Sequence, residues 1–310
     1  MLANVKSTPK SWLAFDLNIL RRVSFNSVVI PISEQPSLGA YLKRWDVRVQ
    51  ANHHLRSSWS RAFAQIANNA QTLTDDEVNA VLDDAYVPGY KLQNEALRTW
   101  FNEIDCWWFD NVRRNIDRLP SQMAQAIASS LVMDVGDYAL TFDDQTRELR
   151  EPLSNAFRRF WSIRPDPYDN RQNNTVANKP ADEFIAETPG DLMFLRLPQA
   201  HSQTVNGYLG RTAWREEWLR GGSGFWESVE RSMAGKLGSP TGTKSQYLNL
   251  LEDLLRRATH IKNWAIAHVE SGFIQTQDIV ETIGRIRRVD TVYTKDFSEL
   301  TGAKGVIITA

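Results

Sequence analysis

Residues 27–55 hold two short apolar segments separated by an amphipathic one, and this pattern constrains the fold more than any other. Residues 28–30 (Val-Val-Ile) and 47–51 (Val-Arg-Val-Gln-Ala) each predict a buried strand. The segment between them has apolar residues at the spacing of one helix face: Leu38, Tyr41, Leu42 and Trp45. A strand, a helix and a strand within about 30 residues form a βαβ unit with parallel strands. We therefore predict an α/β fold, with a ligand position at the turn after the first strand.

The same unit carries a specific residue pattern. Pro31 follows the first strand, Gly39 and the run Tyr-Leu-Lys-Arg at 41–44 lie in the helix, and residues 49–52 read Val-Gln-Ala-Asn. This frame resembles the first motif of Dam-like (alpha-group) adenine-specific DNA methyltransferases. The resemblance implies a Rossmann-like class I methyltransferase sheet with helices on both faces, an inserted helical subdomain, and S-adenosylmethionine as methyl donor.

The positions that hold the donor in this family carry altered residues here. The family's Gly-rich turn is replaced by Ile-Ser-Glu-Gln-Pro-Ser at 32–37, and glycine is the residue that lets backbone approach a ligand closely. The acidic residue expected after Asn52 is a histidine, which removes the acceptor for the ribose hydroxyls. Pro180 stands where an aspartate helps to hold the donor's adenine. The degenerate cofactor positions implied by the resemblance are Pro31, Ser33, Gln35, Gly39, Asn52, His53 and Pro180.

The catalytic motif is altered as well. Residues 191–195 predict a short buried strand, and in the family such a strand runs into Asp-Pro-Pro-Tyr. The corresponding positions here are Arg196, Leu197, Pro198 and Gln199. Arginine offers donors and no acceptor, so it cannot accept a hydrogen bond from the target amino group. Residues 166–168 (Asp-Pro-Tyr) are superficially similar to the motif, but no apolar strand precedes them, so we interpret 162–181 as a loop.

Residues 57–161 show mainly helical patterns, including Thr74 and Glu77 at the spacing of a helix start. We predict a first core segment at 1–56, an inserted helical, target-recognition-like subdomain at 57–161, and a second core segment at 162–310. The alternative interpretation of the insert is a plain helical subdomain that packs on the sheet and has no DNA-reading role. If a DNA-binding cleft is retained, its candidate residues are arginines for phosphates and tryptophans for bases: Arg196, Arg211, Arg215, Trp214 and Trp218.

Composition excludes several classes of protein. The net charge of −1 argues against indiscriminate binding of polyanions, and no apolar stretch reaches the roughly 20 residues that span a membrane. The single cysteine, Cys106, excludes an internal disulfide and fits a cytoplasmic location. No His/Cys/carboxylate cluster has metal-ligand spacing. His201 and His268 fall near the expected active-site edge, where new chemistry is a weaker reading than ordinary polar histidines.

The sequence therefore favours a catalytically inactive DNA adenine methyltransferase-like protein. Its expected role is that of a DNA- or protein-binding component, as partner of an active methyltransferase or of a restriction or defence system, and no cofactor is expected. The alternative is an active S-adenosylmethionine-dependent adenine methyltransferase with divergent motifs. Whether the protein is an enzyme stays open at this point.

Overall fold

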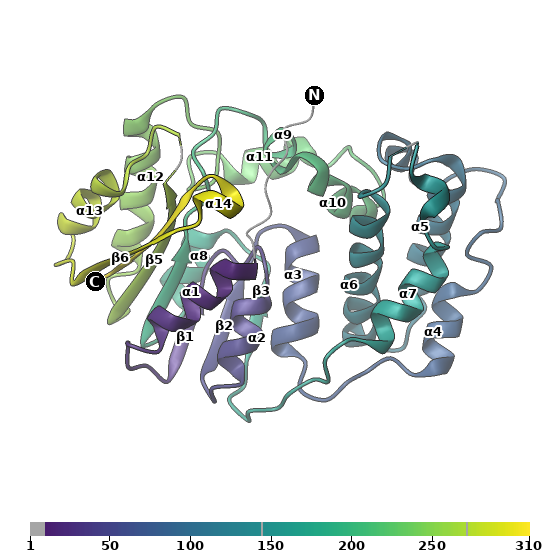
Figure 1. The fold of residues 1–310 in the computed structure, drawn as a ribbon, viewed down its shortest axis with the longest axis horizontal. Coiled ribbons are helices and arrows are strands. Elements are labelled where there is room, and N and C mark those ends of the chain that lie inside the picture. The colour runs from purple at the N-terminus through teal and green to yellow at the C-terminus, as the bar shows by residue number, and fades with distance from the viewer. Residues whose placement is uncertain (1–9, 144, 271) are drawn as a thin grey trace.

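The computed structural model describes residues 10–143, 145–270 and 272–310, and shows a seven-stranded sheet flanked by helices (Figure 1). Residues 1–9 of the first predicted segment lie outside this description. The strands are β1 Ser27–Ile30, β2 Arg48–Asn52, β3 Thr175–Ala177, β4 Leu192–Arg196, β5 Asn263–Glu270, β6 Thr291–Asp296 and β7 Lys304–Thr309. Their order in the sheet is β3-β2-β1-β4-β5-β7-β6. The first five pair in parallel, and β7 is antiparallel to both β5 and β6. The predicted α/β fold is confirmed, as a mixed sheet in which five strands are parallel.

Helices cover both faces of the sheet because successive strand residues point to opposite sides. Val28 and Ile30 pack with α1, α2 and α3, while Val29 packs with α8, α12 and α13. These helices are α1 Lys10–Leu20, α2 Ser37–Lys43, α3 Arg56–Ala62, α8 Ala181–Glu187, α12 Lys244–Arg257 and α13 Thr276–Gly284. The remaining short helix near the C-terminus is α14 Ser298–Thr301.

The central βαβ unit forms as predicted, with one correction. β1 and β2 pair in parallel with Val29 opposite Gln50, and α2 joins them. Tyr41 was predicted on the apolar face of this helix, but its side chain is 49% exposed. The buried stripe of α2 consists of Leu38, Gly39, Leu42 and Lys43. Position 41 lies beside this stripe, so the tyrosine faces outward.

A second hydrophobic cluster, which we call the helical cluster, lies beside the sheet (Figure 1). Its helices are α4 Asp75–Leu82, α5 Glu103–Ile116, α6 Gln122–Ala139, α7 Leu153–Ser162 and, from the later part of the chain, α10 Ala213–Arg220. Thr74 and Glu77 form the predicted capping box at the start of α4. The short helices α9 Val205–Leu209 and α11 Trp226–Met233 form a small cluster of their own with Leu55. The segment boundaries predicted from sequence stay a prediction.

The interpretation of residues 162–181 as loop throughout was wrong at one place. β3 lies within this range and pairs with β2, forming one edge of the sheet. The strand has only three residues and none of them is fully buried, so the sequence shows no apolar pattern there. Asparagine side chains hold the segment instead: Asn174 accepts a hydrogen bond from the Val49 N–H at 2.9 Å.

None of the helices in the described residues has the length and apolar content needed to cross a membrane.

Candidate functional site

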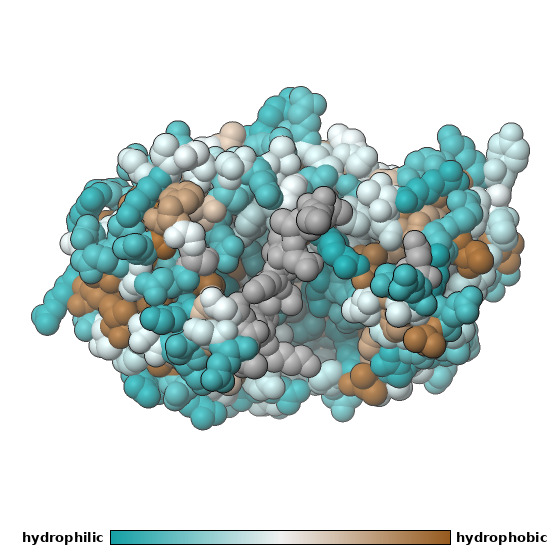
Figure 2. Space-filling view, turned by 45° about the horizontal axis from the view of Figure 1, so that its top comes forward, coloured by the Kyte–Doolittle hydropathy of each residue, from teal (hydrophilic) through white to brown (hydrophobic). Residues whose placement is uncertain are grey.

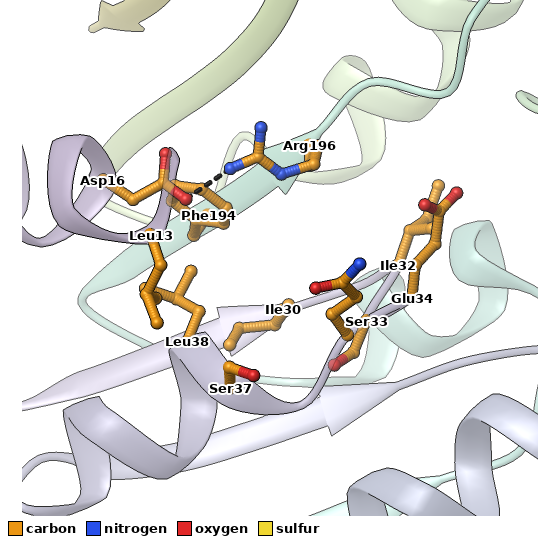
Figure 3. Close-up of a pocket in the computed structure, with 11 residues that line it drawn as sticks. Leu13, Asp16, Ile30, Ile32, Ser33, Glu34, Ser37, Leu38, Phe194 and Arg196 are labelled. Atoms are coloured by element: carbon orange, nitrogen blue, oxygen red, sulfur yellow. Dashed lines mark hydrogen bonds and ion pairs between the residues drawn. The ribbon is translucent and has the colours of Figure 1, made fainter. Parts of the chain in front are cut away.

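The order of strands reverses between β1 and β4, which lie side by side at the centre of the sheet. In open α/β sheets, ligands bind at the carboxyl ends of the strands flanking such a reversal. A pocket of about 80 Å³ opens there (Figure 3). It is lined by Leu13, Asp16, Ile30, Ile32, Ser33, Glu34, Gln35, Ser37, Leu38, Phe194 and Arg196.

An ion pair closes one side of this pocket. Arg196, the last residue of β4, donates a hydrogen bond to the carboxylate of Asp16 on α1 (Figure 3). The guanidinium also lies 5.6 Å from the ring centroid of Trp12 and 5.7 Å from that of Phe194. Burial raises the pKa of Asp16, and the charge and hydrogen bond of Arg196 oppose that rise. Arg196, predicted as a DNA contact, is thus engaged inside the protein with its side chain only 18% exposed.

The turn after β1 follows a course set by polar contacts of its backbone. The Ser33 N–H donates to the Asn52 carbonyl at 2.9 Å, while its buried hydroxyl has no partner. Glu34 reaches into the pocket region and keeps contact with solvent. The surrounding walls nevertheless raise the pKa of Glu34, and Arg196 opposes the rise. Gln35 is exposed at the pocket rim.

Asn52 holds three segments together. Its amide donates to the carbonyls of Pro31 at 2.9 Å and Lys179 at 3.0 Å, and its side-chain oxygen accepts from the Lys179 N–H at 3.0 Å. Asn52 is fully buried, and these bonds tie the ends of β1 and β2 to the turn before α8. Pro180, which follows Lys179, is the N-cap of α8. Asn52 and Pro180 therefore have clear structural roles here.

His53 and Gly39 serve packing and backbone geometry. His53 is buried, accepts a hydrogen bond from the Leu55 N–H through Nδ1 at 3.0 Å, and stacks on His54 at 4.8 Å between ring centroids. Burial, followed by the neighbouring His54, holds the pKa of His53 well below its usual value. A Cβ on Gly39 would lie 2.5 Å from Ile66 Cδ1, so this glycine allows α2 to approach its neighbours closely. Neither residue lines the pocket.

The segment after β4 continues the strand and then turns. The Leu197 N–H donates to the Ala267 carbonyl at 2.9 Å, and the Pro198 carbonyl accepts from the Tyr247 hydroxyl at 2.7 Å. Both residues are buried. The Gln199 side chain is exposed, and its backbone N–H is 3.2 Å from the Tyr208 hydroxyl. No aromatic face stands at this position to receive a base.

The tryptophans predicted as stacking partners for DNA are core residues, which corrects that prediction. Trp214 and Trp218 are both 0% exposed within the helical cluster. The Trp218 indole donates to the Phe109 carbonyl at 2.9 Å, and Trp214 packs against Gly136. A ring buried on both faces cannot stack on a base without unfolding its surroundings.

The two arginines beside them are committed to intramolecular contacts. Arg215 forms a two-pronged contact with the Asp137 carboxylate on α6, including an Nε hydrogen bond of 2.9 Å. Arg211 donates to the Leu140 carbonyl at the end of that helix. These contacts join α10 and its preceding turn to α6. The sequence showed the residue types of a nucleic-acid surface, whereas the structure uses them to attach one helix to another.

The remaining candidates do not converge on a site. His201 stacks on Tyr208 at 3.9 Å, and His268 on β5 is buried with an unpartnered Nε2. Burial lowers the pKa of His268 to about 4 and raises that of Cys106 to about 12. No three His, Cys, Asp or Glu residues of the described chain are grouped to hold a metal ion.

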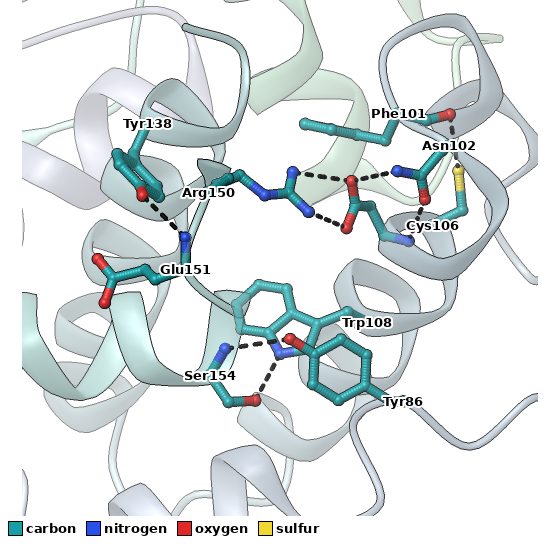
Figure 4. A network of polar contacts seen from close by, with 10 residues as sticks. Tyr86, Phe101, Asn102, Cys106, Trp108, Tyr138, Arg150, Glu151 and Ser154 are labelled. Atoms are coloured by element: carbon teal, nitrogen blue, oxygen red, sulfur yellow. Dashed lines mark hydrogen bonds and ion pairs between the residues drawn. The ribbon is translucent and has the colours of Figure 1, made fainter. Parts of the chain in front are cut away.

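Cys106 belongs to a structural network in the helical cluster (Figure 4). Its sulfur lies 3.5 Å from the Phe101 carbonyl, and the neighbouring Asp105 is paired with Arg150 at 2.7 Å. The side chains of that pair are 5% and 11% exposed. Cys106 is 0% exposed and is therefore a packing residue of this cluster, where burial raises the pKa of its thiol.

Sequence reasoning missed two features of the protein. One is the contribution of Asp16, which no motif marks because its partner is 180 residues away. The other is a larger cleft between α2 and the helical cluster, with a volume of about 920 Å³. Its lining comes from four separate stretches of the chain, so no single motif could reveal it. Among known proteins, no family model and no curated protein matches this chain.

Proposed function

We propose that this chain has a class I methyltransferase-like sheet. We further propose that the protein does not transfer methyl groups and acts as a DNA- or protein-binding component. The strand order 3-2-1-4-5, with an antiparallel seventh strand placed between β5 and β6, supports the first half of the proposal. The residue frame from Pro31 to Asn52 lies on the first βαβ unit of that sheet, where the family carries its first motif.

The Asp16–Arg196 ion pair is the observation that carries the proposed absence of methyl transfer. It occupies the carboxyl ends of β1 and β4, and the pocket left beside it measures about 80 Å³. Sites for small molecules and cofactors are typically about 300–1,000 Å³. A nucleoside-bearing sulfonium such as S-adenosylmethionine does not fit this space. Displacing Arg196 would leave the buried Asp16 carboxylate without its partner, which is costly.

Several further features support the absence of methyl transfer. Arg196 presents donors where the reaction needs an acceptor for the target amino group. Gln199 gives no stacking face for an extruded base. His53 is buried and directed at the Leu55 N–H, so it is not placed to hold ribose hydroxyls.

Calorimetric titration of S-adenosylmethionine and S-adenosylhomocysteine into the purified protein tests this proposal. We expect no saturable binding in the donor pocket and no methyl incorporation into adenine-containing DNA. Micromolar binding accompanied by methylation would establish the alternative, an active enzyme with divergent motifs. Circular dichroism and a cooperative thermal transition confirm that the protein titrated is folded.

A further inference from the structure

A large cleft lies between the sheet and the helical cluster (Figure 2). Its volume of about 920 Å³ lies at the upper end of the range for small-molecule sites. One wall is α2, the other is formed by α6 and α7, and residues 163–168 run along its rim. The floor is apolar, formed by Ala64, Leu73, Ile127 and Leu131.

Aromatic rings and a guanidinium gather on this rim. Tyr41 and Tyr168 line the cleft and are 49% and 38% exposed, so both rings offer an accessible face. Arg44 is the C-cap of α2, three residues after Tyr41, and its guanidinium is 5.7 Å from the Tyr168 ring centroid. Helical spacing and this contact bring the three side chains together as one surface, which we call the Tyr41–Arg44–Tyr168 rim.

The charges of the cleft are unevenly compensated. Asp134 is paired with Arg61 at 2.9 Å, and Asp137 is paired with Arg215, so these two lining carboxylates are neutralised from behind. Arg44 has no ion pair with a carboxylate anywhere in the described residues.

Arg164, also on the lining, donates only to the Ala64 carbonyl, at 3.1 Å, and forms no ion pair within the described ranges. Asp166 is the lining carboxylate that remains without an ion pair in the described chain. Lys43 also belongs to the lining, where its amine donates to the Asn68 carbonyl and to Asn69 Oδ1. Lys43, Arg44 and Arg164 together outnumber Asp166 and leave a surplus of positive charge beside the exposed rings. An arginine next to an aromatic face is a common receptor for an anion joined to a flat ring.

We propose that this cleft binds a nucleotide unit, with the base stacked on the Tyr41–Arg44–Tyr168 rim and the phosphate on Arg44. Stacking on an aromatic face combined with a cationic contact to phosphate is how proteins hold single nucleotides and single strands without reading sequence. The unit can come from a free nucleotide or from a single-stranded nucleic acid. This inference is separate from the question of methyl transfer, because the donor pocket and the rim share none of these three residues.

Calorimetric titration of the full chain with AMP, adenosine, inorganic phosphate and a short adenine oligonucleotide tests the proposal. We expect saturable binding of AMP, with Arg44→Ala weakening it about tenfold while leaving adenosine unchanged. Tyr168→Ala should weaken AMP and adenosine alike, by about fivefold or more. Comparable affinities for AMP and the oligonucleotide identify the free unit as sufficient, whereas an oligonucleotide at least about tenfold tighter identifies a single strand as the source.

Matched controls come from exposed residues outside the cleft lining. Arg257→Ala and Tyr90→Ala remove the same side-chain types outside the lining and should leave AMP affinity unchanged. The proposal is overturned if AMP and the oligonucleotide fail to bind saturably, or if both cleft variants bind as the unmodified protein does.

Titration of S-adenosylhomocysteine in parallel separates the two proposals. Any binding of S-adenosylhomocysteine in the cleft should weaken about fivefold or more in Tyr168→Ala, as for AMP. Binding whose affinity is unchanged in this variant lies outside the rim and contradicts the expectation that the donor pocket does not bind this molecule.

Discussion

The Asp16 carboxylate and the Arg196 guanidinium form an ion pair that joins α1 to the end of β4, where the strand order of the sheet reverses. Asp16 is 3% exposed, and its second oxygen has no hydrogen-bond partner. The pair therefore contributes little net stability, because burying two charges costs desolvation free energy that an apolar contact of the same size would avoid. Because the pair lies at the carboxyl end of the central strand β4 and lines the pocket, it limits the size of ligand that the pocket can bind.

Removing one partner of this pair should be far more costly than replacing both. We expect Arg196→Ala to lower the free energy of unfolding by about 3 kcal/mol, since it leaves a buried carboxylate unpaired. The double variant Asp16→Leu, Arg196→Met should lie within about 1 kcal/mol of the unmodified protein. Urea denaturation of Asp16→Leu, of Arg196→Met and of the double variant measures the coupling. Additive effects would show that the two side chains do not interact.

The same pair predicts a dependence on pH. Burial raises the pKa of Asp16, and loss of Arg196 removes the effect that opposes the rise. A carboxyl with a raised folded pKa favours folding below its unfolded pKa of about 3.9, and this contribution is lost as pH rises through the folded value. The deficit of Arg196→Ala should therefore be larger at pH 7 than at pH 4.5. An equal deficit at both pH values would contradict this assignment.

Gly39 should prove to be a packing residue. In Gly39→Ala the new methyl meets Ile66 Cδ1 at 2.5 Å and Val49 Cγ1 at 3.3 Å, so we expect a loss of about 1–3 kcal/mol. Adding Ile66→Val removes the nearest atom and should recover part of that loss. Gly284→Ala is the matched control, because no atom lies within 4 Å of its added Cβ. We expect the control to be neutral or stabilising by up to about 1 kcal/mol in thermal or urea unfolding.

The sequence predicted the parts of the fold that local patterns encode. The strands of the βαβ unit and the strand at β4 follow from short apolar runs, and the helix between the first two follows from apolar residues at a period of 3.6. β3 escaped because asparagine side chains, rather than buried apolar residues, hold it against β2. Tyr41 was misplaced because a seven-residue helix has room for only one narrow buried stripe.

The candidate site was predictable in place but not in content. The turn after β1 and the end of β4 lie together as the parallel topology requires. Composition does not show whether an arginine or a tryptophan faces solvent or another helix, so the sequence alone predicts Arg215, Trp214 and Trp218 as DNA contacts although they lie between helices. Long-range pairings such as Asp16 with Arg196 leave no local signal at all.

Trp218 offers a direct test of that correction. We expect Trp218→Phe to destabilise the protein by about 2 kcal/mol, because it removes the buried 2.9 Å bond to the Phe109 carbonyl and part of a ring packed on all sides. Trp45→Phe is the control, since this indole is half-buried and no hydrogen bond from its N–H is formed within the described residues. It should cost less than about 1 kcal/mol. Equal effects in guanidinium unfolding would count against a core role for Trp218.

His268 should make the protein sensitive to acid. Burial lowers its pKa to about 4, against opposing effects from Glu270, the Ile274 backbone and Asp278. Between pH 6.5 and 4 the unfolded chain therefore binds a proton that the folded chain excludes, so this group's contribution to stability falls as pH falls through that window.

His268→Asn keeps a polar group near the backbone of Ile274 but cannot titrate there. We expect the slope of the unfolding free energy against pH to decrease by up to about 1.4 kcal/mol per pH unit in this variant, corresponding to one proton. Urea titrations at several values from pH 4 to 8 measure the slope, and the value at pH 8 gives the cost of the substitution itself. Parallel curves for the variant and the unmodified protein would show that His268 does not carry this proton linkage. The buried His53 and the partly buried His54 would then be the groups to replace.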